Sequence, residues 1–367
     1  MKKKFLKLFS VLLLAMMLIV ASAGCSNGSS NGEVVVTDLL GREVTLSSDI
    51  QTAVAIGPGA LRLYCYAGDT EKLCGIEQIE IDSTLGRAYM IANSDLQSLP
   101  VIGAGGPANS PDAEKLIAAA PDVIFTTYAS DASAADELQA KTGIPVIALS
   151  YGSTAPFSDN LNASLTLIGQ VMGTEKQAKT VVNYLNDCKA DLNKRTSGIS
   201  DSDKPTVYYG AQSMKGAHGI ESTTGNYSLF NVLNTKSVVD TADISGYVML
   251  DKEQLLEWNP DVIFIDLGGL SLVKQDYTGN PGYYAALSAF EDGEVYSQLP
   301  YNYYSTNIDV ALIDAYYMGT VLYPDEFKDV DIAKFANDTF KTMLGTDQDI
   351  YSELVDSFGT LGQLTFN

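Results

Sequence analysis

The chain contains few of the residues that build enzymatic and metal centres. Its 367 residues include one histidine, His218, and four arginines, and its four cysteines form no CxxC pair. Bare transition-metal ions usually need several His or Cys ligands with carboxylates, and acid–base catalysis relies most often on histidine. P-loop, GxGxxG and GxSxG motifs are also missing from the sequence. The composition therefore argues against a bare-metal receptor, a nucleotide-binding protein and a serine hydrolase, and predicts a protein that is not an enzyme.

Basic residues are scarce relative to acidic ones. The chain has 23 Lys and Arg against 45 Asp and Glu, which gives a formal net charge of −22. Binding to phosphate backbones depends on clustered Lys and Arg, so no nucleic-acid partner is expected. The length favours two domains.

The N-terminus has the layout of a secretory signal peptide. Residues 1–24 combine four lysines with an apolar run that is too short to cross ~30 Å of hydrocarbon. Ala23, Gly24 and Cys25 resemble the end of a bacterial lipobox, although Ser22 stands where that motif usually has Leu. We expect cleavage before Cys25, lipidation of this cysteine and a flexible tether over residues 25–32. An ordinary cleaved signal with an incidental cysteine is the alternative.

Lipidation of Cys25 would determine where the protein resides. Acyl chains would anchor it to the outer face of the bacterial cytoplasmic membrane, and the rest of the chain would be extracytoplasmic. Loss of residues 1–24 would remove four lysines and no acidic residue, so the net charge would change from −22 to −26.

Beyond the tether, short β-rich runs alternate with amphipathic helical stretches. This alternation predicts an α/β fold with mainly parallel sheets. We expect two Rossmann-like lobes, an N-terminal one over residues 33–172 and a C-terminal one over residues 199–345, followed by a C-terminal tail over residues 346–367.

The segment between the lobes, residues 173–198, predicts one long rigid helix. Thr174 and Gln177 form a capping-box pattern, and apolar residues fall on one helical face from Ala178 to Leu192. A helix from Thr174 to about Arg195 would be roughly 33 Å long, which is enough to join the two lobes.

One line of sequence occurs twice. DAEKLIAAAPDVIF begins at Asp112 and DKEQLLEWNPDVIF begins at Asp251, and the two copies share eight of fourteen residues at an offset of 139. Each copy predicts a helix capped by Asp, ended before Pro and followed by a buried strand. The repeat therefore predicts the same helix-to-strand unit in each lobe, with Glu114 and Glu253 in the first helical turns.

These features resemble the substrate-binding proteins of ABC importers for ferric siderophores, haem and cobalamin, the class III periplasmic binding proteins. The resemblance extends from Glu33 to about Gly345 and includes VTDLLGREVTL, both DxExL…PDVIF units, the central helix and GEVYSQLPYNYYSTN. It implies a monomeric binding protein that delivers its ligand to an ABC permease, a homodimer or heterodimer with its ATPase. It also implies that Glu114 and Glu253 pair with permease arginines, although acids in a first helical turn are favoured by the helix dipole alone.

The resemblance places the ligand in a cleft between the lobes, at loops that follow strands. Tyr301, Tyr303 and Tyr304 could offer flat amphipathic surface to the ligand, and Arg87 or Lys215 could neutralise a ligand charge. Each side chain has an ordinary alternative role, as a solvated charge, a core tyrosine or an unliganded loop histidine. The candidate ligand-binding residues are Arg87, Tyr89, Tyr128, Lys215, His218, Tyr301, Asn302 and Tyr303.

A ferric chelate fits this composition best, because its metal is already wrapped and needs no protein ligand. No resident cofactor is expected. Haem or a corrinoid on the same scaffold is the alternative, since one His or Tyr can serve as an axial ligand. A surface lipoprotein enzyme or adhesin that reuses the fold is a further alternative, which would not require the matched acids Glu114 and Glu253.

Overall fold

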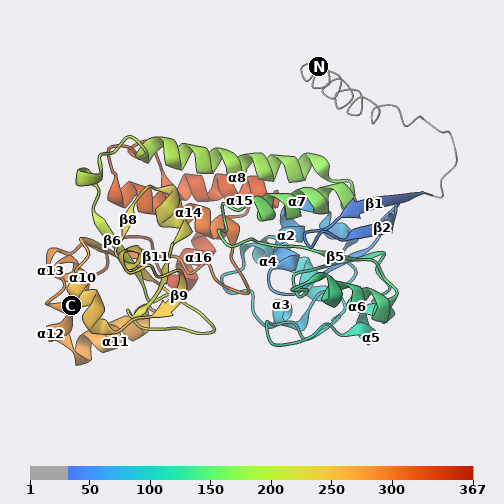
Figure 1. The fold of residues 1–367 in the computed structure, drawn as a ribbon, viewed down its shortest axis with the longest axis horizontal. Helices are drawn as coiled ribbons and strands as arrows, with labels where there is room; N and C mark the ends of the chain where they lie inside the picture. The colour runs from blue at the N-terminus through green and yellow to red at the C-terminus, as the bar shows by residue number, and fades with distance from the viewer. Residues whose placement is uncertain (1–31, 367) are drawn as a thin grey trace, which may run out of the picture.

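A computed structural model describes residues 32–366 of the chain (Figure 1). The predicted signal peptide, Cys25 and all of the predicted tether except Gly32 lie outside the described residues. Within the described range, no helix is both long and apolar enough to cross a membrane.

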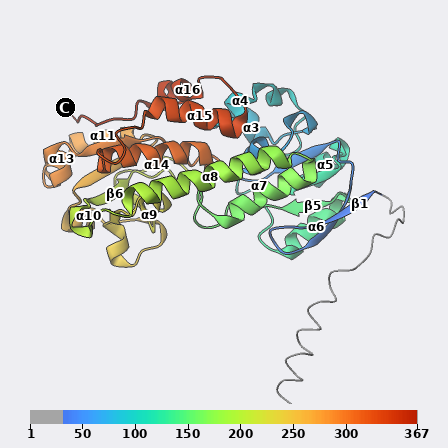
Figure 2. The same ribbon diagram turned by 90° about the horizontal axis from the view of Figure 1, so that it is seen from above.

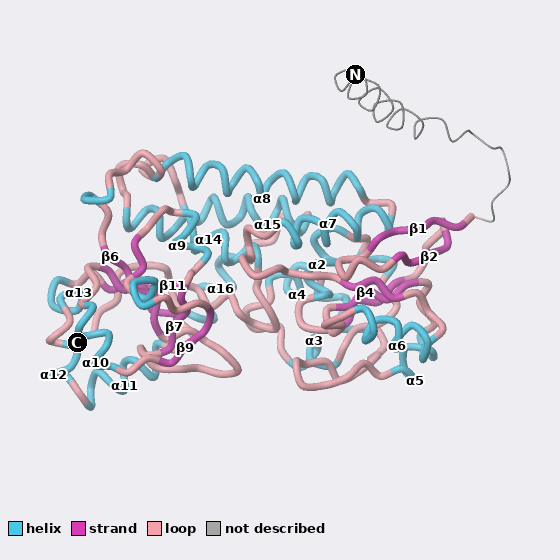
Figure 3. Tube along the Cα trace, in the orientation of Figure 1, coloured by secondary structure: helices cyan, strands magenta, loops and turns pink. Residues whose placement is uncertain are grey.

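The N-terminal lobe is built on a parallel sheet of three strands in the order β3-β4-β5. Strand β4 of this sheet is labelled in Figure 3, where strands are magenta. Every residue of these strands is buried, which is typical of parallel strands with helices on both faces. A separate antiparallel hairpin, β1-β2, precedes this sheet. The elements of this lobe are β1 (Glu33–Thr37), β2 (Glu43–Ser47), β3 (Ala53–Ile56), α2 (Ala60–Ala67), α3 (Gln78–Asp82), α4 (Ala88–Ala92), α5 (Ala113–Ala119), β4 (Val123–Thr126), α6 (Ala132–Thr142), β5 (Val146–Ala148) and α7 (Asp159–Met172).

The C-terminal lobe has a four-stranded parallel sheet in the order β11-β10-β6-β8 and a small antiparallel pair, β7-β9. The two lobes thus confirm the predicted α/β class with mainly parallel sheets. The elements of this part of the chain are β6 (Thr206–Gly210), β7 (Ser222–Gly225), α9 (Ser228–Val232), β8 (Lys236–Ser237), β9 (Gly246–Met249), α10 (Lys252–Trp258), β10 (Val262–Asp266), α11 (Leu270–Gly279), α12 (Pro281–Tyr284), α13 (Ser288–Asp292), β11 (Val295–Gln298), α14 (Ile308–Leu322), α15 (Ile332–Leu344) and α16 (Ile350–Phe358).

Helix α8 (Glu175–Thr196) runs across the top of both lobes (Figure 1). It packs against α2 and α7 of the N-terminal lobe and against α9, α14 and α15 further along the chain. The predicted capping box does not form. Instead, the Thr174 hydroxyl donates a hydrogen bond to the Ala67 carbonyl, and the Gln177 amide donates to the Tyr66 carbonyl. Both side chains therefore fix α8 on α2 rather than closing its own first turn.

The C-terminal segment returns to the N-terminal lobe. Helix α15 packs against α2, α4 and α8, and α16 packs against α4 and α15. Figure 2 shows α15 and α16 extending from the C-terminal lobe towards α3 and α4. The segment 346–367, which the sequence analysis treats as a tail, thus contains a helix that contacts the opposite lobe, and α8 is not the sole element in contact with both lobes.

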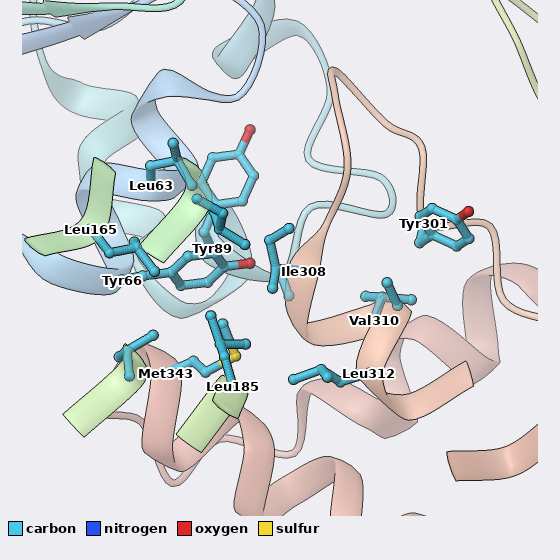
Figure 4. Packing of buried hydrophobic residues seen from close by; sticks show 14 of the residues in the cluster. Leu63, Tyr66, Tyr89, Leu165, Leu185, Tyr301, Ile308, Val310, Leu312 and Met343 are labelled. Atoms are coloured by element: carbon cyan, nitrogen blue, oxygen red, sulfur yellow. The ribbon is translucent and has the colours of Figure 1, made fainter. Parts of the chain in front are cut away.

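A hydrophobic cluster that includes residues of both lobes lies beneath these helices. Buried side chains from α2, α4, α7, α8, α14 and α15 meet there, and Figure 4 shows Tyr66 and Tyr89 facing Ile308 at the start of α14. Continuous apolar packing from one lobe to the other resists their separation, because opening it would expose this surface to water.

The doubled sequence line does form the same unit in each lobe, α5 followed by β4 and α10 followed by β10. Asp112 caps α5 through its side chain, whereas Asp251 precedes α10 without such a bond. The aspartates of the two PDVIF segments also share a role that was not predicted from the sequence. Asp122 accepts hydrogen bonds from the backbone and hydroxyl of Thr52, and Asp261 accepts the same pair from Thr206.

Candidate ligand-binding cleft

A cavity of about 540 Å³ lies between the two lobes. Three parts of the chain surround it, namely an N-terminal wall, a C-terminal wall and the loop that follows β11. The N-terminal wall consists of Pro58, Ile79, Arg87 and Pro107, the C-terminal wall of residues 213–217 and Gly268, and the loop of residues 302–306.

Arg62 of α2 holds this loop against the N-terminal lobe. The Arg62 side chain is fully buried, and its guanidinium donates to the carbonyls of Tyr303, Tyr304 and Thr306 at 2.6–3.2 Å. It also donates to the side-chain oxygen of Asn307 at 2.9 Å. One planar cation with five N–H donors can satisfy several carbonyls that face in one direction. The loop belongs to the C-terminal lobe by sequence but is fastened to the N-terminal lobe.

Tyr304 lies at the tip of the loop and reaches a buried carboxylate. Its hydroxyl donates to Glu77 at 2.8 Å and accepts from the Gly106 amide at 2.9 Å. Glu77 also accepts from the Gly57 amide and the Tyr128 hydroxyl, both at 2.9 Å. Burial raises the pKa of Glu77, and these hydrogen bonds oppose the shift. Tyr304 has a left-handed φ of 53°, a strained conformation for a tyrosine that these contacts hold in place.

Tyr303 presents its ring to the cavity from the same loop. The ring contacts Gly86 of the N-terminal lobe and packs on Phe358 of α16 with ring centroids 5.4 Å apart. Gly86 has φ of +69°, and a Cβ at this position would lie 2.8 Å from the Tyr303 ring. This position therefore requires glycine, for its backbone conformation and for the approach of the ring.

Arg87 lines the N-terminal wall and forms an ion pair beneath it. Its guanidinium donates to Glu80 at 2.8 Å and to the Ile79 carbonyl at 2.6 Å, and it lies 5.4 Å from the centroid of the Tyr304 ring. Glu80 is 1% exposed and also accepts from the Tyr89 hydroxyl at 2.7 Å. The single cation of this wall therefore has its own buried counter-ion.

The C-terminal wall also has a buried carboxylate behind it, Asp266 at the end of β10. This carboxylate accepts from the backbone amides of Ser213 and Gly268, which line the cavity, and from the Tyr209 hydroxyl. Burial raises its pKa to about 6, while these hydrogen bonds limit the shift. Lys215 is exposed on this wall and forms no ion pair with any residue that the structure describes.

Half of the predicted ligand-binding residues line the cavity. Arg87, Lys215, Asn302 and Tyr303 do so. The other four lie elsewhere, so the structure does not support direct ligand contact from them.

Three of these four are tyrosines. Tyr89 is fully buried under Glu80, inside the shared core (Figure 4). Tyr301 is 6% exposed and packs in the same cluster, whereas the next residues of the loop, Asn302 and Tyr303, line the cavity. Tyr128 stands behind Tyr304, with their hydroxyls 3.5 Å apart.

His218, the fourth of these residues, turns back on its own loop. One ring nitrogen lies 2.9 Å from the Met214 carbonyl. Among the residues that the structure describes, no three His, Cys, Asp or Glu side chains come together as a metal site.

Four side chains that organise the cleft were not predicted from the sequence, and these are Arg62, Glu77, Glu80 and Asp266. Tyr304 of the YNYY run was expected to offer ring surface to the ligand, and it lines the cavity. Arg62 was recognisable from its position as a cation inside the apolar helix ALRLYCYA. The three acids give no local signal, because their partners are distant in sequence.

Glu114 and Glu253 are both exposed in the first turns of α5 and α10. Figure 1 shows these helices at opposite ends of the molecule. Ile117, one turn after Glu114, is 50% exposed, whereas its counterpart Leu256 is half-buried.

Two α/β lobes, a cleft between them and a helix packed across both define a two-lobed solute-binding protein. The family model of periplasmic binding proteins matches residues 67–299, and the chain belongs to this family. It is therefore the extracytoplasmic binding protein of an ABC transporter rather than an enzyme, which implies a permease partner and a small ligand.

Individual relatives agree with this assignment. The chain is 26% identical over 340 residues to the molybdate-binding protein MolA of Haemophilus influenzae, covering 87% of this chain and 93% of the relative. It is 22% identical over 272 residues to the uncharacterized ABC transporter substrate-binding lipoprotein YvrC of Bacillus subtilis, covering 71% and 80% of the two chains. A periplasmic solute binding protein from Veillonella parvula has the same fold, with a TM-score of 0.70 at 20% identity over 89% of this chain and 98% of that one.

Proposed function

We propose that the protein captures a metal chelate, a ferric siderophore, in the interlobe cleft and delivers it to an ABC permease. The cavity carries this proposal. Its volume of about 540 Å³ lies in the range of sites that enclose compact organic ligands. Tyr303 and Tyr304 offer ring surface and hydroxyls, and Arg87 and Lys215 face the cavity from opposite walls.

Molybdate is the second candidate, because MolA is similar to this chain over most of its length and binds molybdate. Arg87 and Lys215 would then meet the oxyanion directly. The cavity is larger than a small tetrahedral anion needs, which makes the chelate the first choice.

Calorimetric titration of the purified protein distinguishes these candidates. We expect saturable one-to-one binding of a ferric siderophore and much weaker binding of its iron-free form. Molybdate, haem and cobalamin are titrated under the same conditions. Binding of molybdate alone would establish the second candidate, binding of haem or cobalamin alone would replace the ferric chelate, and no binding of any compound would contradict the proposal.

The same proposal assigns Glu114 and Glu253 to permease docking. Two exposed carboxylates at opposite ends of a strongly acidic protein can orient it on a basic permease rim, and such charges affect encounter and register more than affinity. A first-turn acid also stabilises its own helix, by about 0.3–1 kcal/mol at an exposed site, and both roles are compatible.

A matched pair of double variants tests the docking role. Glu114→Ala with Glu253→Ala should leave ligand affinity unchanged and lower uptake into cells or proteoliposomes. The control is Glu137→Ala with Glu257→Ala, which removes two exposed acids from α6 and α10 outside their first turns. Equal uptake in the two double variants would contradict the docking role.

Membrane anchoring through Cys25 completes the proposal. The lipobox-like sequence before Cys25 and the similarity to a substrate-binding lipoprotein support it. Cys25→Ser should transfer the protein from the membrane fraction to the soluble extracytoplasmic fraction, and continued membrane association of the variant would contradict lipidation at this residue.

A further inference from the structure

The charges around the cleft bear on which chelate the protein can bind. Both walls contain a cation, and both have buried carboxylates behind them. Arg87 and its partner Glu80 are 2.8 Å apart, with side chains 7% and 1% exposed, so the cation and its counter-ion share a poorly hydrated environment. In such an environment the field of the pair is close to that of a dipole, and little net positive charge remains for a ligand.

Two further buried carboxylates lie behind the cavity walls and add negative charge near the cavity. Glu77 is 4% exposed and lies behind Tyr304, and Asp266 is 1% exposed and binds the amides of Ser213 and Gly268 from behind. Burial raises the pKa of both acids, to about 6 for Asp266, and the hydrogen bonds from N–H and O–H donors oppose this shift towards the protonated form. Each amide that binds a carboxylate on one side is also less available to an anion on the other.

Lys215 is the cavity-lining cation that has no ion pair within the described part of the chain. It is exposed, so water screens its charge. The protein as a whole carries a net charge of −22, which repels a multiply charged anion before it reaches the cleft.

From this balance, and on the basis of the proposed chelate capture, we infer that the cleft selects chelates that are neutral or singly charged and rejects multiply anionic ones. Three hydroxamates neutralise Fe³⁺ completely, whereas three catecholates leave three negative charges on the complex. Burying an anion without matching cations is unfavourable, because the lost hydration is not replaced. Ferric tris-hydroxamates therefore fit the cleft, and ferric tris-catecholates do not.

The test compares ferric chelates of different charge in calorimetric titrations at low salt. Neutral ferrichrome should bind at least about a hundredfold more tightly than trianionic ferric enterobactin, a difference of about 2.7 kcal/mol. Tighter binding of ferric enterobactin would overturn the inference while leaving chelate capture intact. Failure of both chelates to bind would instead contradict the proposed function itself.

A gain-of-function variant gives a readout that a purely structural role of Glu80 would not produce. Glu80→Gln removes the counter-ion of Arg87 and keeps the size of the side chain, so the ratio of ferrichrome affinity to ferric enterobactin affinity should fall about tenfold. An unchanged ratio would contradict the inference. Circular dichroism and thermal unfolding show whether the variant is folded. Glu137→Gln on α6 is the control, with the same charge change on an exposed helix. If Glu80→Gln does not fold, the ratio measured with the unmodified protein decides the question.

Discussion

The two lobes share a folding unit but contribute differently to the cleft. In each lobe a helix, a proline and a buried strand follow one another, and Asp122 and Asp261 bind the threonine at the start of the neighbouring strand in the same way. Each lobe also has a buried carboxylate behind the cleft. Glu77 accepts from one backbone amide and two tyrosine hydroxyls, and Asp266 accepts from two backbone amides and one tyrosine hydroxyl.

The difference lies in what each lobe does with the loop after β11. The N-terminal lobe binds this loop through Arg62 and Glu77, although it emerges from the C-terminal lobe. On the N-terminal wall Arg87 is paired with the buried Glu80, whereas the C-terminal wall is a loop with the exposed residues Met214 and Lys215. A repeated framework therefore supports an asymmetric site, so similarity between the lobes does not extend to their roles in binding.

The largest expected effect concerns the arginine that ties the loop to the opposite lobe. Arg62→Met should lower the free energy of unfolding by about 3–5 kcal/mol, because three carbonyls and Asn307 lose a buried cationic donor. Urea denaturation measures this loss. Arg195→Met is the control, because Arg195 also binds carboxylates and a carbonyl but near the surface, and it should lose only about 1 kcal/mol. A larger loss at Arg195 would contradict the role assigned to Arg62.

The next largest expected effect concerns Asp266, the buried carboxylate behind the C-terminal wall. Burial raises the pKa of Asp266 to about 6 in the folded protein, above the usual value near 4 in an unfolded chain. A raised carboxyl pKa means that the folded state holds the proton more tightly. The contribution of Asp266 to the free energy of unfolding is therefore greatest below about pH 4. It decreases as the pH rises from about 4 to about 6, and it is constant above that range.

Asp266→Asn should remove this decrease. Between pH 4 and pH 7 the unmodified protein should lose about 2–3 kcal/mol relative to the variant, measured as the difference between their free energies of unfolding. Burial raises the pKa of Asp314 well above its usual value, and Asp314 is close enough to interact with Asp266. The pH profile of Asp314→Asn is therefore measured alongside that of Asp266→Asn. Parallel pH profiles for the unmodified protein and Asp266→Asn would contradict a raised pKa at this position.

The sequence predicted the framework well because its signals are local. Apolar periodicity, Asp caps and Pro at helix ends predicted α8, both helix-to-strand units and the parallel sheets, and the structure contains all of them. The role of α16 was missed, because its docking on α4 depends on contacts between residues that are far apart in the sequence.

The cleft was predicted only in part for the same physical reason. Arg62 and Asn307 are separated by 245 positions, and Glu77 and Tyr304 by 227. No periodicity or motif encodes such a pair, so tyrosine richness pointed to the correct loop but not to the residues that face the cavity. Tyr301 and Tyr303 differ in burial although only one residue lies between them.

The smallest expected effect compares the two repeated aspartates directly. Asp122→Ala and Asp261→Ala should each lower the free energy of unfolding by about 1 kcal/mol, because each carboxylate stabilises a strand start through exposed hydrogen bonds. The loss at Asp122 should be the larger one, since this carboxylate also accepts from the Gln51 amide. Urea denaturation of both single variants and the double variant measures the losses.

Additivity in the double variant then tests whether the repeated units are independent. The two aspartates belong to different lobes and share no hydrogen-bond partner, so the losses should add to within about 0.5 kcal/mol. A deviation from additivity above about 1 kcal/mol would mean that the substitution in one lobe changes the stability of the strand start in the other lobe. The elements able to transmit it are α8 and α15, because both pack against the N-terminal α2 and against α14, the helix that follows β11 and its loop.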